Sequence, residues 1–181
     1  TLRVWDVATQ KELLKVEPDM GQISRIQLSA DESVAMIYSF QKDKVALVEL
    51  ASGKVIHTAQ YPNDRLYNAA LSADGKTVLA AGGHDDVSQD LMIWKPQSGG
   101  SFASVSLHPG RIYAMTLTPD GQDFILTGSE LSDAAAKTYR PFAASYSTSS
   151  GQLTKLDGSA LGYITRFFTE PGATTTYTTG S

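Results

Sequence analysis

The 181-residue chain contains no cysteine, which excludes disulfides, thiolate zinc sites and cysteine nucleophiles together. Its three histidines, His57, His84 and His108, lie far apart and show none of the paired spacing that metal sites require. We therefore expect no metal and no cofactor. The absence of cysteine, with the absence of a basic and then apolar leader, favours a cytoplasmic protein.

Concentrated charge and long apolar runs are also missing. The net charge is −4 and no block of Lys and Arg stands out, so the electrostatic footprint of a nucleic-acid-binding protein is absent. No apolar run approaches the ~18–20 residues that span a membrane. Helical periodicity is absent almost throughout, and only residues 131–137 could form a helical turn.

Motifs that carry chemistry are equally scarce. Residues 84–90 hold three carboxylates but lack the alternating order, central glycine and late glutamate of a calcium loop. No Gly-x-Ser-x-Gly elbow is present, and no glycine pair precedes a helix as in a phosphate-binding loop. His108 is a better candidate for a structural network than for a catalytic base. The sequence therefore predicts no catalytic residue.

What the sequence does contain is a repeat. A strand-like segment with a bulky residue recurs, and this bulky column steps through Trp5, Val48, Trp94 and Tyr146, at spacings of 43, 46 and 52. The strand-forming residues around each member of the column predict short β-strands. A repeat of this length, built from short strands, predicts a stacked or radial β architecture.

A second recurring element fixes the phase of the repeat. A strand runs into a turn that contains Asp31, Asp74 or Asp120, and these aspartates are 43 and 46 residues apart. Asp and Ser side chains cap their own backbone in such turns, and glycine takes the position with positive φ. Further strands follow each turn, so each unit of ~40–50 residues holds four strands, as a propeller blade does.

These units predict an all-β fold, a β-propeller segment of about four blades, each a four-stranded antiparallel sheet. One blade has two apolar faces that it cannot bury alone, so neighbouring blades must stack. The expected boundaries are a half blade at 1–17, blades at about 18–60, 61–107 and 108–157, and a half blade at 158–181.

The residues resemble those of the WD-repeat β-propeller family. Trp5-Asp6 matches the signature dipeptide of that family, and the turns at 72–75 and 118–121 resemble its Ser-Pro-Asp-Gly turn. The resemblance covers essentially the whole chain, with repeats that depart from the consensus. It implies structural roles for Trp5, Asp6, Asp74, Trp94, His108 and Asp120.

The resemblance also implies a rigid disc whose faces bind other proteins or other domains of the parent chain. We expect a protein-interaction scaffold or a regulatory or sensor propeller, without nucleic-acid or membrane partners. An architectural propeller half inside a large complex is the alternative. An enzyme is a third class, but no inward-facing polar cluster recurs to support it.

Candidate protein-binding residues are Arg65, Tyr67, Arg111 and Tyr113. The two arginines correspond between repeats, as do the two tyrosines, and Tyr163 lies in or next to the tyrosine column. Arginine and aromatic residues dominate binding hot spots, although tyrosines can instead pack between blades with their hydroxyls satisfied. The expected binding loops, on the upper surface, are residues 17–22, 61–65 and 108–111.

Two features concern the outline of the molecule. Residues 129–141 lengthen the last spacing to 52, and their Ala-rich centre lacks a strand pattern, so we expect an inserted loop. The half blades are complementary, which allows three closures: one chain as a ring of about four blades, two copies head to tail, or a larger propeller completed by further blades. We expect the last.

Overall fold

The computed structural model describes residues 1–84, 89–105, 110–118, 120–133, 138–156, 164–169 and 176–180. Within these ranges the secondary structure is almost entirely β, with one short 3₁₀ helix, η1 (Pro96–Ser98). No helix in this part of the chain is long and apolar enough to cross a membrane. The strands are β1 (Leu2–Asp6), β2 (Lys11–Val16), β3 (Arg25–Leu28), β4 (Val34–Ser39), β5 (Lys44–Glu49), β6 (Lys54–Gln60), β7 (Arg65–Leu71), β8 (Val78–Gly83), β9 (Asp90–Trp94), β10 (Ala103–Val105), β11 (Arg111–Leu117), β12 (Asp123–Asp133), β13 (Thr138–Ser147), β14 (Leu153–Leu156), β15 (Ile164–Thr169) and β16 (Thr176–Gly180).

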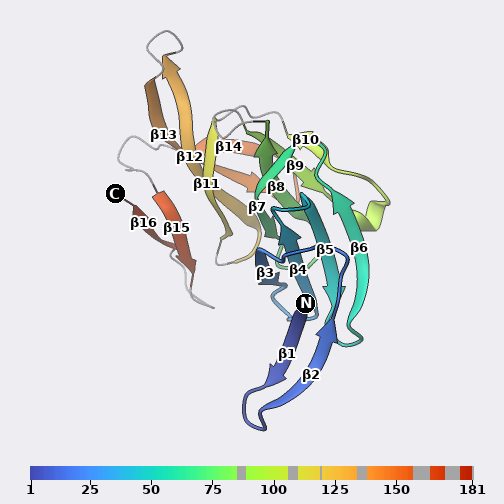
Figure 1. Ribbon diagram of the computed structural model, residues 1–181. Coiled ribbons are helices and arrows are strands. Elements are labelled where there is room, and N and C mark those ends of the chain that lie inside the picture. Colours follow the sequence, from blue (N-terminus) through green and yellow to red (C-terminus); the bar gives the residue numbers. More distant parts are fainter. Residues whose placement is uncertain are drawn as a thin grey trace.

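Strands that follow one another in the chain lie next to one another in antiparallel sheets. Three sheets have four strands, β3-β4-β5-β6, β7-β8-β9-β10 and β11-β12-β13-β14. The pairs β1-β2 and β15-β16 form separate two-stranded sheets, so the described strands do not join into a blade that closes one chain on itself. Figure 1 shows β15–β16 beside β11 and β1–β2 below β5 in the view. The predicted all-β architecture of four-stranded antiparallel units is confirmed.

Among the described residues, the three junctions from the β1–β2 sheet to the β11–β14 sheet are each filled by an apolar core. Because successive side chains in a strand point to opposite faces, β4 and β5 bury two different sets of residues. Ala35 and Val48 pack against the β1–β2 sheet, whereas Met36 and Leu47 pack against the β7–β10 sheet. The central strands are therefore apolar on both faces, as expected for sheets that are covered on both sides.

Trp94 is part of the core between the β3–β6 sheet and the β7–β10 sheet. Its side chain is 3% exposed, and its ring lies edge-on to His57 of β6, with 6.4 Å between the centroids. The ring of Phe102 lies 5.7 Å away, and the indole Nε1 donates a hydrogen bond to the carbonyl of Gly100 at 3.0 Å. Trp94 thus fills a contact with the preceding sheet.

Trp5 differs in burial from the other members of the bulky column. It is 52% exposed, although Val48, Trp94 and Tyr146 in the same column are buried. Those three residues face the preceding sheet, whereas Trp5 belongs to none of the three apolar cores among the described residues. β1 instead packs through its opposite face, where Leu2 is buried. No contact between sheets is therefore formed at Trp5 within the described residues.

The same turn follows the first strand of each four-stranded sheet. An aspartate accepts hydrogen bonds from a hydroxyl two residues before it and from a backbone N–H two residues after it. The same hydroxyl oxygen accepts the N–H that begins the next strand. The hydroxyl and carboxylate oxygens are 2.7 Å apart in Ser29–Asp31, 2.6 Å in Ser72–Asp74 and 2.6 Å in Thr118–Asp120.

These local hydrogen bonds favour the ionised carboxylates. The hydroxyl of Ser29, together with the backbone and side chain of Ser33, lowers the pKa of Asp31 to about 2. In the first turn of the chain, the backbone N–H of Thr9 donates to Asp6 at 2.9 Å and lowers the pKa of that carboxyl. Asp6, Asp31, Asp74 and Asp120 thus serve as turn caps.

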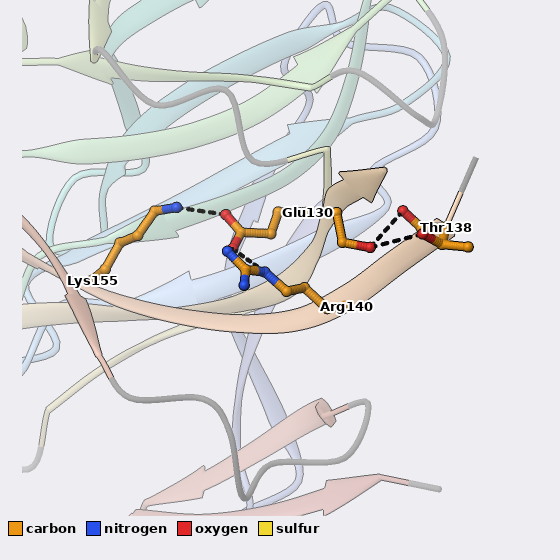
Figure 2. Close-up of polar contacts among 5 residues, drawn as sticks. Glu130, Thr138, Arg140 and Lys155 are labelled. Atoms are coloured by element: carbon orange, nitrogen blue, oxygen red, sulfur yellow. Dashed lines mark hydrogen bonds and ion pairs between the residues drawn. The ribbon is translucent and has the colours of Figure 1, made fainter. Parts of the chain in front are cut away.

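The longest strands, β12 and β13, form a hairpin arm that extends beyond its neighbours (Figure 1). Figure 2 shows Glu130 between two cations. It accepts hydrogen bonds from Arg140 Nε at 2.8 Å and from Lys155 Nζ at 2.5 Å. Nearer the tip, the Ser132 hydroxyl donates to the Thr138 carbonyl at 3.0 Å.

The arm corrects the prediction of an inserted loop at 129–141. Residues 129–133 pair with residues 138–141 as antiparallel strands, so neither a loop without strand pattern nor a helical turn that includes 131–133 is present. Pairing and the cross-strand contact of Glu130 with Arg140 outweigh the weak local preference of this sequence. Residues 134–137 lie outside the described ranges.

Candidate functional site

An open groove lies where the β3–β6 sheet meets the β7–β10 sheet. Its volume is about 470 Å³. One wall comes from the turn between β4 and β5, and the other comes from the start of β7. Because strands alternate in direction, the β4–β5 turn and the β6–β7 loop lie at the same end of the sheets. The lining residues are Phe40, Gln41, Asp43, Arg65, Leu66 and Tyr67.

Asp43 joins the two walls of the groove. Its Oδ1 accepts a hydrogen bond from the backbone N–H of Leu66 at 2.9 Å. Its carbonyl oxygen accepts hydrogen bonds from the Tyr61 N–H at 2.8 Å and from the Gln60 amide at 3.1 Å. Asp43 has a φ of 51°, a left-handed conformation that Asp adopts more readily than most residues. The start of β7 is thereby fixed against the β4–β5 turn.

Tyr61 anchors the loop beside the groove. Its side chain is 2% exposed, and its hydroxyl donates to the Asp90 carbonyl at 2.9 Å. Burial, together with the charge of Asp90, raises the pKa of the Tyr61 phenol. Asn63 in the same loop donates to the Asp90 carboxylate at 2.6 Å. The 61–65 loop is thus tied to β9 as well as to the β4–β5 turn.

Tyr67 and Tyr113 sit at corresponding β-bulges. The pairing of β7 with β8 skips Tyr67, and the pairing of β11 with β12 skips Tyr113. A bulge bends its strand and redirects the side chain of the extra residue. A Cβ on Gly82 would lie 2.0 Å from the Arg65 carbonyl oxygen, so the chain needs glycine beneath this bulge.

The two bulge tyrosines differ in their surroundings. The Tyr113 hydroxyl lies 3.0 Å from Ser129 Oγ, within hydrogen-bond distance. Ser129 pairs with Arg111, and Gly83 occupies the corresponding place opposite Arg65, so no hydroxyl is available there. Among the described residues, the Tyr67 hydroxyl forms no hydrogen bond. The Tyr113 hydroxyl is therefore engaged within its own sheet, whereas Tyr67 lines the groove.

The two arginines also differ. Arg65 is exposed and forms no ion pair with any described residue. Arg111 is more buried than Arg65, and it interacts with other groups. The junction beside Arg111 repeats the Asp43 contact, since Gln89 Oε1 accepts the Ile112 N–H at 2.9 Å. The structure places Arg65 and Tyr67 in one groove, and Arg111 and Tyr113 one sheet further along.

The other predicted site residues are placed as follows. The 17–22 loop meets the β4–β5 turn through the Gln22 N–H, which lies 3.3 Å from Gln41 Oε1. His108 lies outside the described residues, with the first half of the 108–111 loop, as does Tyr163. The β15–β16 register assigns the bulge position in that sheet to Thr165. Nowhere in the described ranges do three or more potential metal-ligating residues gather.

Sequence reasoning missed four of the groove residues, Phe40, Gln41, Asp43 and Leu66. The signal at Phe40 was an aromatic residue at the polar end of a strand, where it is 46% exposed. Asp43 carried a weaker signal, because Gln89 lies 46 residues later, the same separation as between Leu66 and Ile112. Such pairs become visible only once the sheets are known to be neighbours.

No family model matches the chain. A WD repeat-containing protein of Synechocystis is 25% identical over 120 residues, which cover 66% of this chain and 33% of that protein. Together with the repeated four-stranded sheets, this likeness decides the class. The chain is a WD-repeat-like β-propeller segment.

Two further comparisons concern the propeller segment. Eukaryotic translation initiation factor 3 subunit I of Culex quinquefasciatus is 29% identical over 143 residues, which cover 72% of this chain and 42% of that protein. The structure of Kuenenia stuttgartiensis hydrazine synthase matches with a TM-score of 0.71 over 97% of this chain and 54% of that chain. At 15% identity that match shows the fold alone. The propeller segment spans less than half the length of these curated relatives.

Proposed function

We propose that the propeller segment is a protein-interaction scaffold without catalytic activity, which binds partners at the end of the blades where the 17–22, 61–65 and 108–111 loops lie. Arg65, Tyr67, Arg111 and Tyr113 are the proposed contact residues, and the groove beside Arg65 and Tyr67 is the observation that carries the proposal. One named relative is a subunit of a translation initiation factor, which supports membership of a cytoplasmic protein complex.

Charge reversal at the two equivalent arginines tests this function. A random peptide library is selected on the 181-residue chain, and bound clones are then measured on the double variant Arg65→Glu/Arg111→Glu. We expect enrichment of discrete sequences whose binding falls roughly tenfold or more on the variant, because arginines at interface centres act as hot spots. Equal thermal unfolding midpoints establish that the variant is folded. Selected peptides that bind both proteins equally, or no enrichment at all, would contradict the proposal.

An architectural role inside a larger complex is the second candidate. It is favoured by uncovered apolar side chains, since Trp5 is 52%, Leu13 is 64% and Ile26 is 52% exposed. Large exposed apolar residues mark surfaces that a partner covers. In that case Trp5→Ser/Leu13→Ser should abolish assembly with the partner, whereas Arg65→Glu/Arg111→Glu should leave it intact. The pair of double variants thus separates the two functions.

A further inference from the structure

We propose that the groove between the β4–β5 turn and the start of β7 binds an acidic peptide segment, with one carboxylate held by Arg65 and Tyr67 and a neighbouring apolar side chain against Phe40. This inference rests on the proposed function, because it names the chemistry of the partner that the scaffold binds. In this inference one side of the groove binds the carboxylate of the peptide, and the other side contacts its apolar side chain.

The carboxylate half of the groove follows from two polar side chains that bond to no other described residue. The Arg65 guanidinium presents several N–H donors in a planar fork that matches a carboxylate, and no described acid occupies it. Tyr67 lines the same groove at the bulge, and Gly83 stands at the position that corresponds to Ser129, the hydrogen-bond partner of Tyr113. An arginine and a phenol at the start of one strand, neither bonded through its side chain to a described residue, form a site for an anionic oxygen.

The apolar half of the groove is rigid. Phe40 is 46% exposed, and its ring lies edge-on to the buried ring of Tyr38, with 5.2 Å between the centroids. Its backbone N–H donates to the Ser24 hydroxyl oxygen at 3.0 Å, which fixes the turn that carries it. Leu66, 1% exposed, lies in the same lining. An exposed aromatic ring on a fixed turn suits an apolar or aromatic side chain of the partner.

The negative charge of Asp43 should lower the affinity of the groove for an acidic peptide. The proposal therefore predicts the direction in which the affinity changes when that charge is removed. Its carboxylate shares the lining with Arg65, but one oxygen already accepts the Leu66 N–H at 2.9 Å. The remaining negative charge repels an incoming carboxylate. Asn at this position keeps an oxygen acceptor for Leu66 and removes the charge, so it should strengthen binding of an acidic peptide and weaken binding of a basic one.

Fluorescence anisotropy with designed probes tests the inference. The probe is a short fluorescein-labelled peptide that carries glutamates on both sides of one phenylalanine, and its matched partner carries glutamines in place of the glutamates. We expect binding to fall roughly tenfold or more with Arg65→Gln and several-fold with Tyr67→Phe, since hydrogen bonds to charged groups are the strong ones. We expect Asp43→Asn to tighten binding by about two- to fivefold and added salt to weaken it.

Two controls make the result specific to the groove. Lys95→Gln removes an exposed cation at the opposite end of β9 and should leave the affinity unchanged. Arg111→Gln changes the corresponding arginine at the junction of the β7–β10 and β11–β14 sheets. It should reduce the affinity for the acidic probe less than Arg65→Gln does. Tyr67→Phe keeps the ring, so a loss there is due to the hydroxyl rather than to packing.

The outcomes separate this inference from the proposed function. Equal binding of the glutamate and glutamine probes, or weaker binding of the acidic probe to Asp43→Asn, overturns the acidic specificity. If library peptides still depend on Arg65 in that case, the scaffold function stands and only its partner chemistry is wrong. Failure of the acidic probe to bind the unmodified chain overturns the inference outright, and the library selection then decides the scaffold function by itself.

Discussion

Trp94 and Trp5 occupy the same position of the repeat, yet only Trp94 is buried. Replacing Trp94 with alanine removes a ring that packs on His57 and Phe102, so it should lower the free energy of unfolding by roughly 3–5 kcal/mol. Trp5→Ala is the matched control and should change it by less than about 0.5 kcal/mol. Guanidinium unfolding measures both. Equal midpoints for Trp94→Ala and the unmodified chain would show that the column is not part of the core.

The lowered pKa values of the turn carboxylates predict that the stability of the fold decreases at low pH. The pKa of Asp31 falls from its ordinary value of 3.8 to about 2 because Ser29 and Ser33 donate to it. The pKa of Asp120 is lowered chiefly by the Thr118 hydroxyl. A carboxyl whose pKa is lower in the folded state stabilises the fold fully above its unfolded pKa and loses that contribution as the pH falls through the folded value. We therefore expect the denaturant midpoint to fall as the pH decreases from about 4 towards 2.

The triple variant Asp31→Asn/Asp74→Asn/Asp120→Asn tests whether these turns cause the loss. At Asp74 partial burial opposes ionisation, but the Ser72 hydroxyl and the Lys76 backbone outweigh it and lower the pKa. The variant should be less stable than the unmodified chain at neutral pH and should show a flatter profile below pH 4. An equally steep acid profile in the variant would assign the effect to other groups.

At this scale the sequence predicted which residues correspond but not which of them are available. The equivalence of Arg65 with Arg111 and of Tyr67 with Tyr113 follows from spacing alone. That the Tyr113 hydroxyl is engaged while the Tyr67 hydroxyl is not depends on Ser129 and on its counterpart Gly83 across a strand pair. Trp5 differs from the rest of its column for a related reason, since burial depends on a neighbouring sheet and not on the strand itself.

Among the elements, the β7 bulge depends on one glycine. A Cβ added at Gly82 would meet the Arg65 carbonyl oxygen at 2.0 Å and the Tyr61 ring at 2.7 Å. Gly82→Ala should therefore destabilise the chain by about 1–3 kcal/mol, as overpacking does, and should disturb the groove. At Gly100 the nearest atom to an added Cβ is Ser98 Oγ at 3.9 Å, so Gly100→Ala is the control. Urea unfolding compares the two, and similar stabilities would mean that the close approach is relieved without cost.

The hairpin arm is expected to be separable from the fold. Its outer part pairs only within the arm, whereas Glu130 at its base contacts Lys155 of β14. Deletion of residues 131–137, with Glu130 and Thr138 joined by a short glycine-rich turn, should leave a cooperative unfolding transition at nearly the same midpoint. Loss of cooperativity in calorimetry would instead make the arm part of the core.

The order and type of the elements could be read from the sequence because turn residues recur in step with the strands. The arm could not, since its centre has weak strand propensity and is held by pairing and by the Glu130–Arg140 contact.

At the scale of the whole molecule, each sheet is stabilised by its neighbours. Three cores fill the junctions from the β1–β2 sheet to the β11–β14 sheet, so no four-stranded sheet buries both faces by itself. The sequence predicted this stacking from repeat length and from strands that are apolar on both faces. It did not predict that a groove lies at one junction, because the groove walls come from residues 40–43 and 65–67 of different sheets.

The most direct test of the account is to map the binding surface on the intact chain. Backbone amide chemical shifts are recorded with and without a peptide selected from the library. We predict that the largest changes cluster at residues 40–43 and 65–67, with smaller ones near Arg111. Changes concentrated on the hairpin arm or on the turns around Asp74 and Asp120, with the groove amides unmoved, would contradict the assignment of function to this groove.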